Sequence, residues 1–344
     1  MKKSVFVAGA SGFIGIRVCN ELIRKGYEVH AHGLVKPGAP EPLIKKSVKY
    51  FINGDLLNPK DCANVQKHLV KHSIDRIIYA AGSVNYKMDY QTSKLYNVDT
   101  VKNFLDIAEK IHAKKKLKKI VFLGSVASRG FLLPGKRSPK LIDETSDYYA
   151  KGLSVYCDVK REMEDLIRES FKRTGIPAVI AEPGSLVGGE IDGMTTTNIG
   201  LIRKISRGIP VLGGGASYTS AGKVAEGIVL VLEKGGAGES YLLGGENMPM
   251  INFAFIVRAI IKKNAGYVKA PFIPVIVLPD LVAKALGNFN IILSSQQALL
   301  GSAFHYIDSG KAMRELGYSH MRADLESEII KVLEQIAEES HTSN

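Results

Sequence analysis

The sequence predicts an α/β fold in which one parallel β-sheet is covered by helices on both faces. Short β-branched runs alternate with helical patterns over the first half of the chain, and several runs are continuously apolar, as is typical of strands buried on both faces. A glycine-rich turn follows the first run directly, and the alternation ends after Gly184. We therefore expect a doubly wound sheet over residues 1–184. Residues 185–340 would form a smaller C-terminal substrate-binding region that partly returns to the core.

The expected elements follow one another in a regular order. Six short runs bounded by turn residues are the expected strands: residues 4–9, 28–34, 49–54, 76–82, 119–125 and 177–184. Three segments between them carry apolar residues at helical spacing: residues 14–26, 97–111 and 155–175. In the C-terminal part we expect four helices: residues 223–234, 251–264, 274–287 and 322–340.

Composition narrows the class of protein. The chain has 344 residues, of which 45% are apolar, and can bury a continuous core. No apolar run approaches the roughly 20 residues that a membrane-spanning helix needs, because the longest candidate, residues 271–286, is interrupted by Pro274, Pro279 and Asp280. The three cysteines have no metal-ligand spacing and support no disulfide framework. We therefore expect a cytoplasmic protein without a membrane span.

Charge and histidine spacing suggest two further kinds of site. The formal net charge is +12, and the run from Lys114 to Lys119 concentrates it. This run has no interleaved aromatic residues that would stack on bases, so the sequence disfavours a nucleic-acid partner. His68 and His72 would share a helix face, but no carboxylate accompanies them. We expect a solvated helix there, and no metal site.

A glycine-rich turn follows the first expected strand. Gly9, Gly12 and Gly15 stand directly after the apolar run and at the opening of a helix. Glycines in this context allow a tight turn and a close approach of the backbone, so that free amides at the helix N-terminus can face a pyrophosphate. We predict a cofactor-binding turn made of these glycines and the residues between them: Ser11, Phe13 and Ile14.

The spacing of these glycines, with two residues between successive glycines, resembles the extended short-chain dehydrogenase/reductase family, whose fold is a Rossmann-type sheet. In "INGDLLNP", Asp55 and Leu56 match the residues that hold adenine in that family. The segment "YAAG" at residues 79–82 matches the family's segment after the fourth strand, and Asn97 matches an asparagine that supports the cofactor site. The resemblance implies further cofactor contacts from Asp55, Leu56, Ala80, Ala81, Gly82, Asn97, Tyr156, Lys160 and Pro183.

The end of the second strand favours NADP over NAD. A carboxylate at this place would hydrogen-bond the ribose 2′-hydroxyl of NAD and repel a 2′-phosphate. Gly33 occupies the place, and after Glu28 no acidic residue follows until Glu41. Lys36, and also Arg17, would supply positive charge for the phosphate. We therefore expect NADPH as the cofactor.

Two tyrosines are followed by a lysine at the fourth position: Tyr156 by Lys160, and Tyr90 by Lys94. Residues four apart share one face of a helix, so the spacing alone does not separate the two pairs. Their places in the chain do, because Tyr90 follows the fourth strand, whereas Tyr156 begins a long helix after the fifth. Ser125 ends the fifth strand, at the edge where ligands of open α/β sheets bind. We predict that Ser125, Tyr156 and Lys160 converge over the glycine turn.

These three residues match the Ser, Tyr and Lys triad of the short-chain family. Hydride that arrives at a ketone carbon leaves an alkoxide, which needs an acid to protonate it and a dipole to stabilise it. The resemblance implies that Tyr156 is the acid/base and that Lys160 lowers its pKa. Ser125 would hydrogen-bond the substrate oxygen. We therefore predict that Ser125, Tyr156 and Lys160 are catalytic.

The expected reaction is the interconversion of a ketone and a secondary alcohol. The family's 4,6-dehydratases usually carry Thr, Asp and Glu where this chain has Ser125, Val126 and Ala127, which argues against dehydration. The chain fits better in the branch that resembles dihydroflavonol reductases and 3β-hydroxysteroid dehydrogenases. Apolar segments at residues 271–286 and 289–295 would line a pocket for a small hydrophobic substrate, although core packing explains them equally well. We predict an NAD(P)-dependent oxidoreductase.

Two alternatives stay open. One is a nucleotide-sugar epimerase with tightly bound NAD, for which Arg203 and Arg207 are candidate anchors of a pyrophosphate. The other is a non-catalytic protein that binds nucleotide or RNA. Glu182 stands where the family usually has arginine or another residue without a carboxylate, and Lys223 replaces a common aspartate, so the substrate stays open. The resemblance also implies a homodimer that pairs the fourth helix and the tyrosine-bearing helix, whose segment "MEDLIRESF" has an apolar face.

Overall fold

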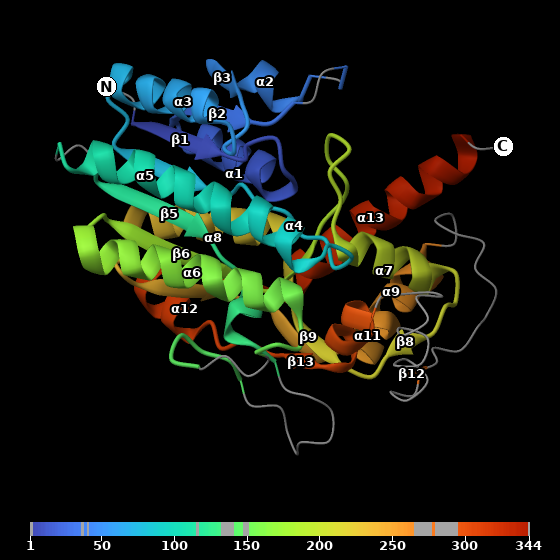
Figure 1. Cartoon of the computed structure of the whole chain (residues 1–344). Helices are drawn as coiled ribbons and strands as arrows, with labels where there is room; N and C mark the ends of the chain where they lie inside the picture. Colours follow the sequence, from blue (N-terminus) through green and yellow to red (C-terminus); the bar gives the residue numbers. More distant parts are fainter. Residues whose placement is uncertain are drawn as a thin grey trace.

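The protein is built around a parallel sheet of seven strands (Figure 1). The structure is a computed structural model that describes residues 3–35, 38–39, 41–114, 117–131, 141–146, 151–264, 277–278 and 295–342. The strands lie in the order β10-β6-β5-β4-β1-β2-β3, and all neighbours are parallel. Their bounds are β1 Ser4–Ala8, β2 Glu28–Gly33, β3 Tyr50–Asn53, β4 Arg76–Tyr79, β5 Lys119–Leu123, β6 Ala178–Pro183 and β10 Ser240–Leu243.

Helices cover both faces of this sheet, which confirms the predicted fold class. One face packs on α1 (Phe13–Arg24), α8 (Ala221–Lys234) and α12 (Gly310–Leu316). The other packs on α3 (Pro59–Lys71), α5 (Thr100–His112) and α6 (Val155–Thr174), which lie side by side in Figure 1. The strands are buried on both sides: in β1, Val5 and Val7 belong to the first core and Phe6 to the second. This explains the continuous apolar runs of the sequence.

The helix ends follow local sequence signals. Asn58 caps α3 by accepting the amide hydrogen of Lys60 at 2.9 Å, with Pro59 at the first helical position. Ser154 caps α6 by accepting from the amide of Cys157 at 3.5 Å. The same helix ends at Gly175, which has a φ of 68°, a conformation that glycine adopts without strain. The long helix expected at residues 155–175 is therefore present within one residue.

After β3 the chain crosses over to the other side of β1 within the sheet, where it forms β4. Strands β2 and β3 lie on one side of β1, and β4, β5, β6 and β10 lie on the other. The carboxyl ends of β1 and β4 therefore flank a topological switch point, where ligands of open α/β sheets bind. The glycine turn follows β1 directly, and "YAAG" ends β4.

The C-terminal part forms a second, smaller layer. Its sheet has the order β11-β9-β13, and β7 also pairs with β9. Strand β7 follows β6 after one glycine, Gly184, so the two sheets are directly connected. A separate core lies between β9 and the helices of this part. The elements are β7 Ser185–Val187, α7 Thr197–Ser206, β8 Val211–Leu212, β9 Gly215–Ser220, β11 Glu246–Pro249, α9 Met250–Lys263, α11 Ser295–Ser302, β13 Phe304–His305 and α13 Arg322–Thr342.

Three sequence expectations need correction or lie beyond the described residues. The helix expected at 274–287 is wrong where the structure describes it, because Val277–Leu278 form β12, which pairs with β8. Prolines and β-branched residues surround this dipeptide and oppose a helix. The rest of the apolar segments at 271–286 and 289–295 lies outside the described residues, apart from Ser295. Strand β10 was not among the expected strands.

The helix face with two histidines is not solvated, contrary to expectation. His68 Nε2 lies 2.8 Å from Nδ1 of His30, a buried residue of β2. The ring of His72 lies 4.6 Å from the ring of Tyr50 in β3. The i, i+4 spacing predicted a shared face but gave no information on what that face contacts. None of the helices in the described ranges is long and apolar enough to cross a membrane.

Candidate active site

Tyr156 and Lys160 lie on one face of the first turns of α6 and are buried. Their exposed fractions are 7% and 6%. The Lys160 ammonium nitrogen lies 5.9 Å from the centroid of the Tyr156 ring. The predicted i, i+4 relation therefore holds, and both polar ends lie inside the protein.

Ser125 lies beside Tyr156, at the carboxyl edge of the sheet. It follows β5 after Gly124 and caps η2, a short 3-10 helix at Val126–Arg129, by accepting from the amide of Ala127 at 3.2 Å. The Ser125 hydroxyl also hydrogen-bonds the Tyr156 side chain. The structure thus brings Ser125, Tyr156 and Lys160 together.

The glycine turn has the close packing that the sequence suggested. Gly9 has a φ of 79°, and a Cβ there would lie 2.5 Å from the amide nitrogen of Ala81. A Cβ on Gly15 would lie 2.0 Å from the carbonyl oxygen of Gly9. The turn between β1 and α1 is therefore pressed against the end of β4, and glycine is required at both places.

The start of α1 fits a pyrophosphate. Its N-cap is Gly12, and no described side chain caps it. The amides of the first turn have no partners within the helix, so they remain available for an anion at the switch point. Phe13 and Ile14 open this turn, and Ser11 precedes it.

Gly82 connects the glycine turn to the triad. It has a φ of 150°, and a Cβ there would lie 3.6 Å from the Lys160 ammonium and 2.9 Å from Asn97 Oδ1. Asn97 is fully buried and ties down this segment, since its amide donates to the carbonyls of Ser83 and Ser93 at 3.1 and 3.0 Å. It lies in a π-helical turn, Leu95–Asp99, between α4 (Tyr90–Lys94) and α5. Such turns recur at functional sites.

The arrangement agrees with what comparison of the sequence shows. Residues 5–244 match the family model described as the NAD dependent epimerase/dehydratase family. The chain belongs to this family. It is thereby one of the extended short-chain dehydrogenases/reductases, as the sequence motifs predicted.

Individual relatives of this family are distant but span the whole chain. A Candida albicans protein named sterol-4-alpha-carboxylate 3-dehydrogenase, decarboxylating, is 23% identical and covers 98% of both chains. The solved structure of gox2253 is 24% identical, covers 97% of this chain and 98% of that one, and superposes with a TM-score of 0.76. The UDP-glucuronic acid 4-epimerase of Bacillus cereus, solved with UDP-glucuronic acid and NAD, is 20% identical over 98% of this chain and 99% of that one, with a TM-score of 0.72. The likeness to these structures shows the fold.

The pKa shifts at the triad of this family member are dominated by burial. Burial raises the pKa of Tyr156 to about 12, and the hydrogen bond with Ser125 opposes the shift. Burial lowers the pKa of Lys160 to about 8. The expected lowering of the tyrosine pKa is therefore not what this structure gives, because the loss of water around the phenol outweighs its polar contacts.

The residues that match the family's adenine site form a rigid corner after β3. The Asp55 carboxylate accepts the amide hydrogen of Leu57 at 2.9 Å, and the Asp55 amide donates to Asp61 at 2.8 Å. Leu56 is buried, and its carbonyl accepts from Asn103 of α5 at 2.8 Å. These bonds fix both predicted residues at the carboxyl edge of the sheet.

At the end of β2 there is little room for a side chain. A Cβ on Gly33 would lie 2.4 Å from the hydroxyl of Ser11, so the glycine leaves room for that side chain. Lys36 lies outside the described residues. Arg17 is engaged on the C-terminal side, where it donates to the carbonyl of Gly189 at 2.6 Å, so its position does not support the expected contact with a 2′-phosphate. Pro183 ends β6, at the same edge of the sheet as the triad.

Apolar side chains from both the N-terminal part and the C-terminal layer pack around Tyr156. Tyr86 packs edge-on against Tyr156, with ring centroids 5.2 Å apart. Phe131 is buried, and its ring centroid lies 5.2 Å from that of His305 in β13. The cluster around Tyr156 is completed by Ala127, Cys157, Leu299, Leu300 and Ala303. The sequence reasoning missed this apolar wall because its members come from several helices and loops that are far apart in the sequence and share no period.

Proposed function

We propose that this protein is an NADP-preferring oxidoreductase that interconverts a ketone and a secondary alcohol on a small hydrophobic substrate. The observation that carries the proposal is the convergence of Ser125, Tyr156 and Lys160 beside Gly82, at the switch point that the glycine turn also borders. Membership of a family that contains NAD-dependent oxidoreductases and epimerases supports it.

In this proposal the nicotinamide supplies or accepts the hydride. Tyr156 donates a proton to the oxygen of the reduced carbonyl, and it withdraws that proton in the reverse direction. Ser125 donates a hydrogen bond to the same oxygen and so stabilises its developing charge. Lys160, whose ammonium lies beside Gly82, stabilises the phenolate of Tyr156 and binds the ribose hydroxyls of the nicotinamide nucleoside.

Two observations support a hydrophobic substrate. Tyr86, Phe131 and Leu299 belong to an apolar and aromatic wall around the phenol of Tyr156. The Candida albicans relative that spans the chain is named for a sterol carboxylate, and the sterol part of such a molecule is apolar. A wall of this kind binds apolar surface through the hydrophobic effect and orients it with few polar groups.

The proposed preference for NADP depends on the end of β2. Gly33 offers no carboxylate to the ribose 2′-hydroxyl, and Ser11 fills the neighbouring space with a hydroxyl. Replacing Gly33 with Asp, together with Ser11→Gly to make room for the new side chain, would introduce the missing carboxylate. We expect this variant to lose affinity for NADPH and to retain affinity for NADH in fluorescence titrations, because the carboxylate repels a 2′-phosphate.

We further propose that residues 1–184 bind the dinucleotide and that residues 185–340 supply most of the substrate contacts, in a cytoplasmic homodimer. The apolar face expected for pairing needs correction, because Met163 and Ile167 pack in the protein's own core. Exposed apolar side chains at Leu95, Tyr96 and Leu153 are better candidates for the contact. Sedimentation at micromolar concentration tests it, and a monomer alone would contradict it.

A nucleotide-sugar epimerase is the second candidate. The fold shared with the Bacillus cereus UDP-glucuronic acid 4-epimerase favours it. Of its two candidate anchors, Arg203 already pairs with Glu339 of α13 at 2.9 Å.

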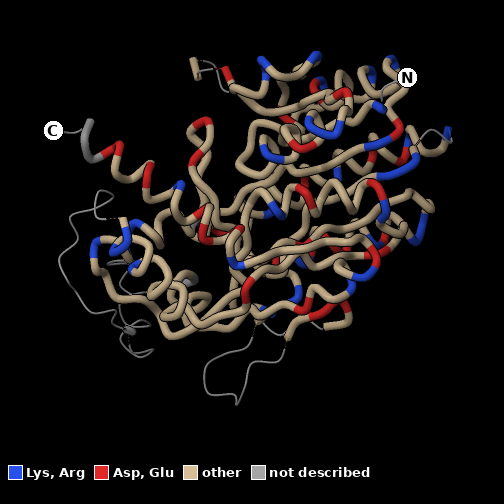
Figure 2. The backbone as a smooth tube through the Cα atoms, turned by 180° about the vertical axis from the view of Figure 1, so that it is seen from behind, with Lys and Arg blue, Asp and Glu red and all other residues tan. Residues whose placement is uncertain are grey.

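For the alternative of nucleic-acid binding, Figure 2 shows Lys and Arg interspersed with Asp and Glu along the chain. Lys118, in the lysine run, pairs with Asp75 at 2.6 Å.

One experiment separates the reductase from the epimerase. The nucleotide that copurifies with the protein is released by heat and identified by mass spectrometry. The reductase is supported if the bound nucleotide is NADPH that exchanges freely, and if the protein then oxidises added NADPH with one of a panel of cyclic and aromatic ketones. NAD that stays bound through gel filtration would instead support the epimerase, and turnover of UDP-sugars without net oxidation of NADPH would establish that reaction.

A further inference from the structure

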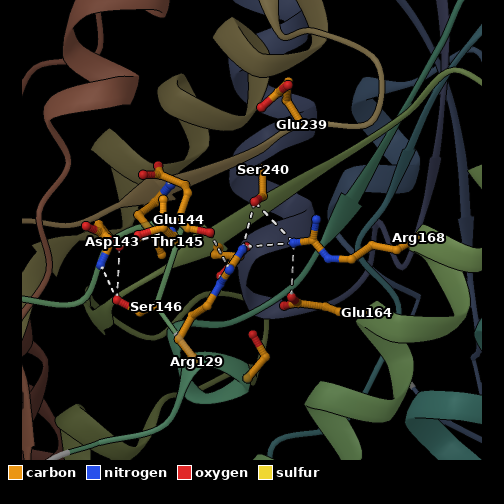
Figure 3. Close-up of polar contacts among 12 residues, drawn as sticks. Arg129, Asp143, Glu144, Thr145, Ser146, Glu164, Arg168, Glu239 and Ser240 are labelled. Carbon is orange, nitrogen blue, oxygen red and sulfur yellow. Dashed lines mark hydrogen bonds and ion pairs between the residues drawn. The ribbon is translucent and has the colours of Figure 1, made fainter. Parts of the chain in front are cut away.

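A buried group of charged side chains gathers around Arg129 (Figure 3), and one member, Glu164, contacts the amide of Ser125. Arg129, at the end of η2, holds Glu182 of β6 by two hydrogen bonds, from Nε at 2.7 Å and from Nη2 at 2.5 Å. Ser240 of β10 accepts from Arg129 at 2.7 Å and from Arg168 at 3.2 Å. Glu182, which the sequence singled out as unusual, is fully buried and paired.

Glu164 joins this group to the catalytic helix. Tyr156, Lys160 and Glu164 occupy successive turns of one face of α6, and Glu164 has an exposed fraction of 2%. Its carboxylate accepts the amide hydrogen of Ser125 at 3.4 Å. A Cβ on Gly124 would lie 2.5 Å from the same oxygen, so this glycine leaves the space that the carboxylate fills. Glu164 therefore contacts the strand end that carries Ser125.

The two buried carboxylates do not share their cations equally. Glu182 takes both hydrogen bonds of Arg129, whereas the nearest cation to Glu164 is Arg168, with its nitrogen 3.8 Å away. Burial, together with the negative charge of Glu182, raises the pKa of Glu164. Burial therefore favours the protonated form of Glu164, and this residue ionises at a higher pH than an exposed glutamate does.

The charge of Glu164 acts on Lys160. Burial lowers the pKa of Lys160 to about 8, and the Glu164 carboxylate opposes this shift. Glu164 also raises the pKa of Tyr156, but as the smallest of the four contributions, which is consistent with its place two turns away. Ionised Glu164 thus favours a charged Lys160 and disfavours a phenolate at Tyr156.

We propose that Glu164 is a positioning residue that holds the end of β5 against α6 and that, once ionised, it increases the fraction of Lys160 that carries a charge. This inference rests on the proposed function for its consequence in catalysis. The groups that face Glu164 come from several neighbouring elements: Tyr156, Lys160 and Arg168 from α6, Glu182 from β6, Ser125 from the end of β5, and Ser128 and Arg129 from η2; Ser240 of β10 and Glu144 are linked to it through Arg129.

The first test follows the binding of NADPH over pH 6 to 9, with Glu164→Gln compared with Asp165→Asn. Asp165 is the next residue on α6, but its side chain is exposed and pairs with Arg161. Below neutrality Glu164 is protonated, so glutamine is a close mimic and we expect wild-type affinity. At pH 9 we expect Glu164→Gln to bind NADPH at least about threefold more weakly than the wild type. A fall of one unit in the pKa of Lys160 lowers the ratio of charged to neutral lysine about tenfold, and half a unit lowers it about threefold. Asp165→Asn should follow the wild type.

The second test needs neither nucleotide nor substrate. The pKa of Glu164 is higher in the folded than in the unfolded chain, so its stabilising proton is lost as the pH rises through the folded value. The melting temperature of Glu164→Gln relative to the wild type should therefore increase from pH 5 to about pH 8 and then level off. The proposal would be overturned, and only a packing role would be left for Glu164, if the melting-temperature difference were constant over this pH range and the NADPH affinities of the two proteins changed in parallel with pH.

Two outcomes separate this inference from the proposed function. If the melting difference depends on pH but no ketone of the panel supports oxidation of NADPH, the role of Glu164 stands and the proposed reductase function is rejected. If Glu164→Gln fails to fold, Ser128→Ala replaces it, because the Ser128 hydroxyl lowers the pKa of Glu164 and its loss would leave less of this carboxylate ionised at pH 9. We expect a weaker form of the same alkaline loss of NADPH affinity, and a loss that is equal at pH 6 and pH 9 would contradict the proposal.

Discussion

Two tyrosine–lysine pairs with the same spacing lie in opposite surroundings. In both pairs, Tyr156 with Lys160 and Tyr90 with Lys94, the ammonium nitrogen lies 5.9 Å from the ring centroid. Tyr156 is 7% exposed and Tyr90 is 39% exposed. Tyr90 and Lys94 both bind the carboxylate of Glu162, each at 2.7 Å. The local geometry is thus shared, and burial is what separates the two pairs.

The lysines of the two pairs shift in opposite directions. Burial lowers the pKa of Lys160 to about 8, whereas the hydrogen bond to Glu162 raises the pKa of Lys94. Only the buried lysine changes its charge near neutral pH, which is the range where a tyrosine acid/base needs a tunable neighbour. A helical pair therefore gains chemical function from the place of its helix in the fold.

The largest difference between the pairs is expected in turnover. With a ketone identified by the panel, Tyr156→Phe should lower kcat by about a thousandfold, because it removes the acid/base while keeping the ring. NADPH binding should stay nearly unchanged in fluorescence titrations. Tyr90→Phe, the matched control, should keep kcat within about twofold. Equal losses in the two variants would remove the distinction between the pairs.

A second difference is expected in stability. Lys160 has a lower pKa in the folded than in the unfolded chain, so the unfolded chain binds more protons between about pH 8 and 10.4, and stability rises with pH there. The cost of the buried charge is fully present below pH 8. Lys160→Met should therefore be more stable than the wild type at pH 7, by up to about 3 kcal/mol, and this gain should shrink towards pH 10.4.

Thermal unfolding at several pH values measures this effect, and Lys94→Met is its control. The ammonium of Lys94 is exposed and paired at the surface, so its replacement should give no gain that varies in this way with pH. A gain for Lys160→Met that stays constant from pH 7 to pH 10.4 would show that lost charge is not its cause.

Much of the fold was predictable because its signals are local. All six expected strands are present, since strands such as β1 and β5 are buried on both faces and carry continuous apolar runs. Strand β10 was missed because its four residues follow a glycine-rich loop outside the regular alternation. The helix expected at 274–287 failed at Val277–Leu278, where neighbouring prolines and pairing with β8 outweigh apolar spacing.

The site was predictable only in part, because only some of its residues are marked by local signals in the sequence. The glycine turn and the three triad residues are each marked by their place next to a strand or helix. The partners that surround them are not: Arg129 pairs with Glu182 across 53 residues, and Tyr86 meets Tyr156 from a separate loop. Sequence reasoning recognised Glu182 as unusual, but only tertiary contact explains how the protein tolerates a buried carboxylate there.

A smaller difference concerns the polar partner of each phenol. Tyr156 hydrogen-bonds the hydroxyl of Ser125, and Tyr90 hydrogen-bonds the carboxylate of Glu162. Ser125→Ala should lower kcat by about tenfold, since one hydrogen bond to a developing charge contributes about 1.5 kcal/mol. It should also move the acid/base limb of the pH profile to higher pH, because Ser125 lowers the pKa of Tyr156. An unchanged profile would place Ser125 outside the acid/base step.

The smallest effect is expected at the exposed pair. Glu162→Gln removes the charge that both Tyr90 and Lys94 contact. Surface ion pairs are weak, so the melting temperature should stay within about 2 °C of the wild type, and kcat should not change. Glu162 nevertheless belongs to α6, the helix that also carries Tyr156. A clear fall in kcat would mean that the contact between α4 and α6 helps to orient the buried phenol, and that the two pairs are coupled through this helix.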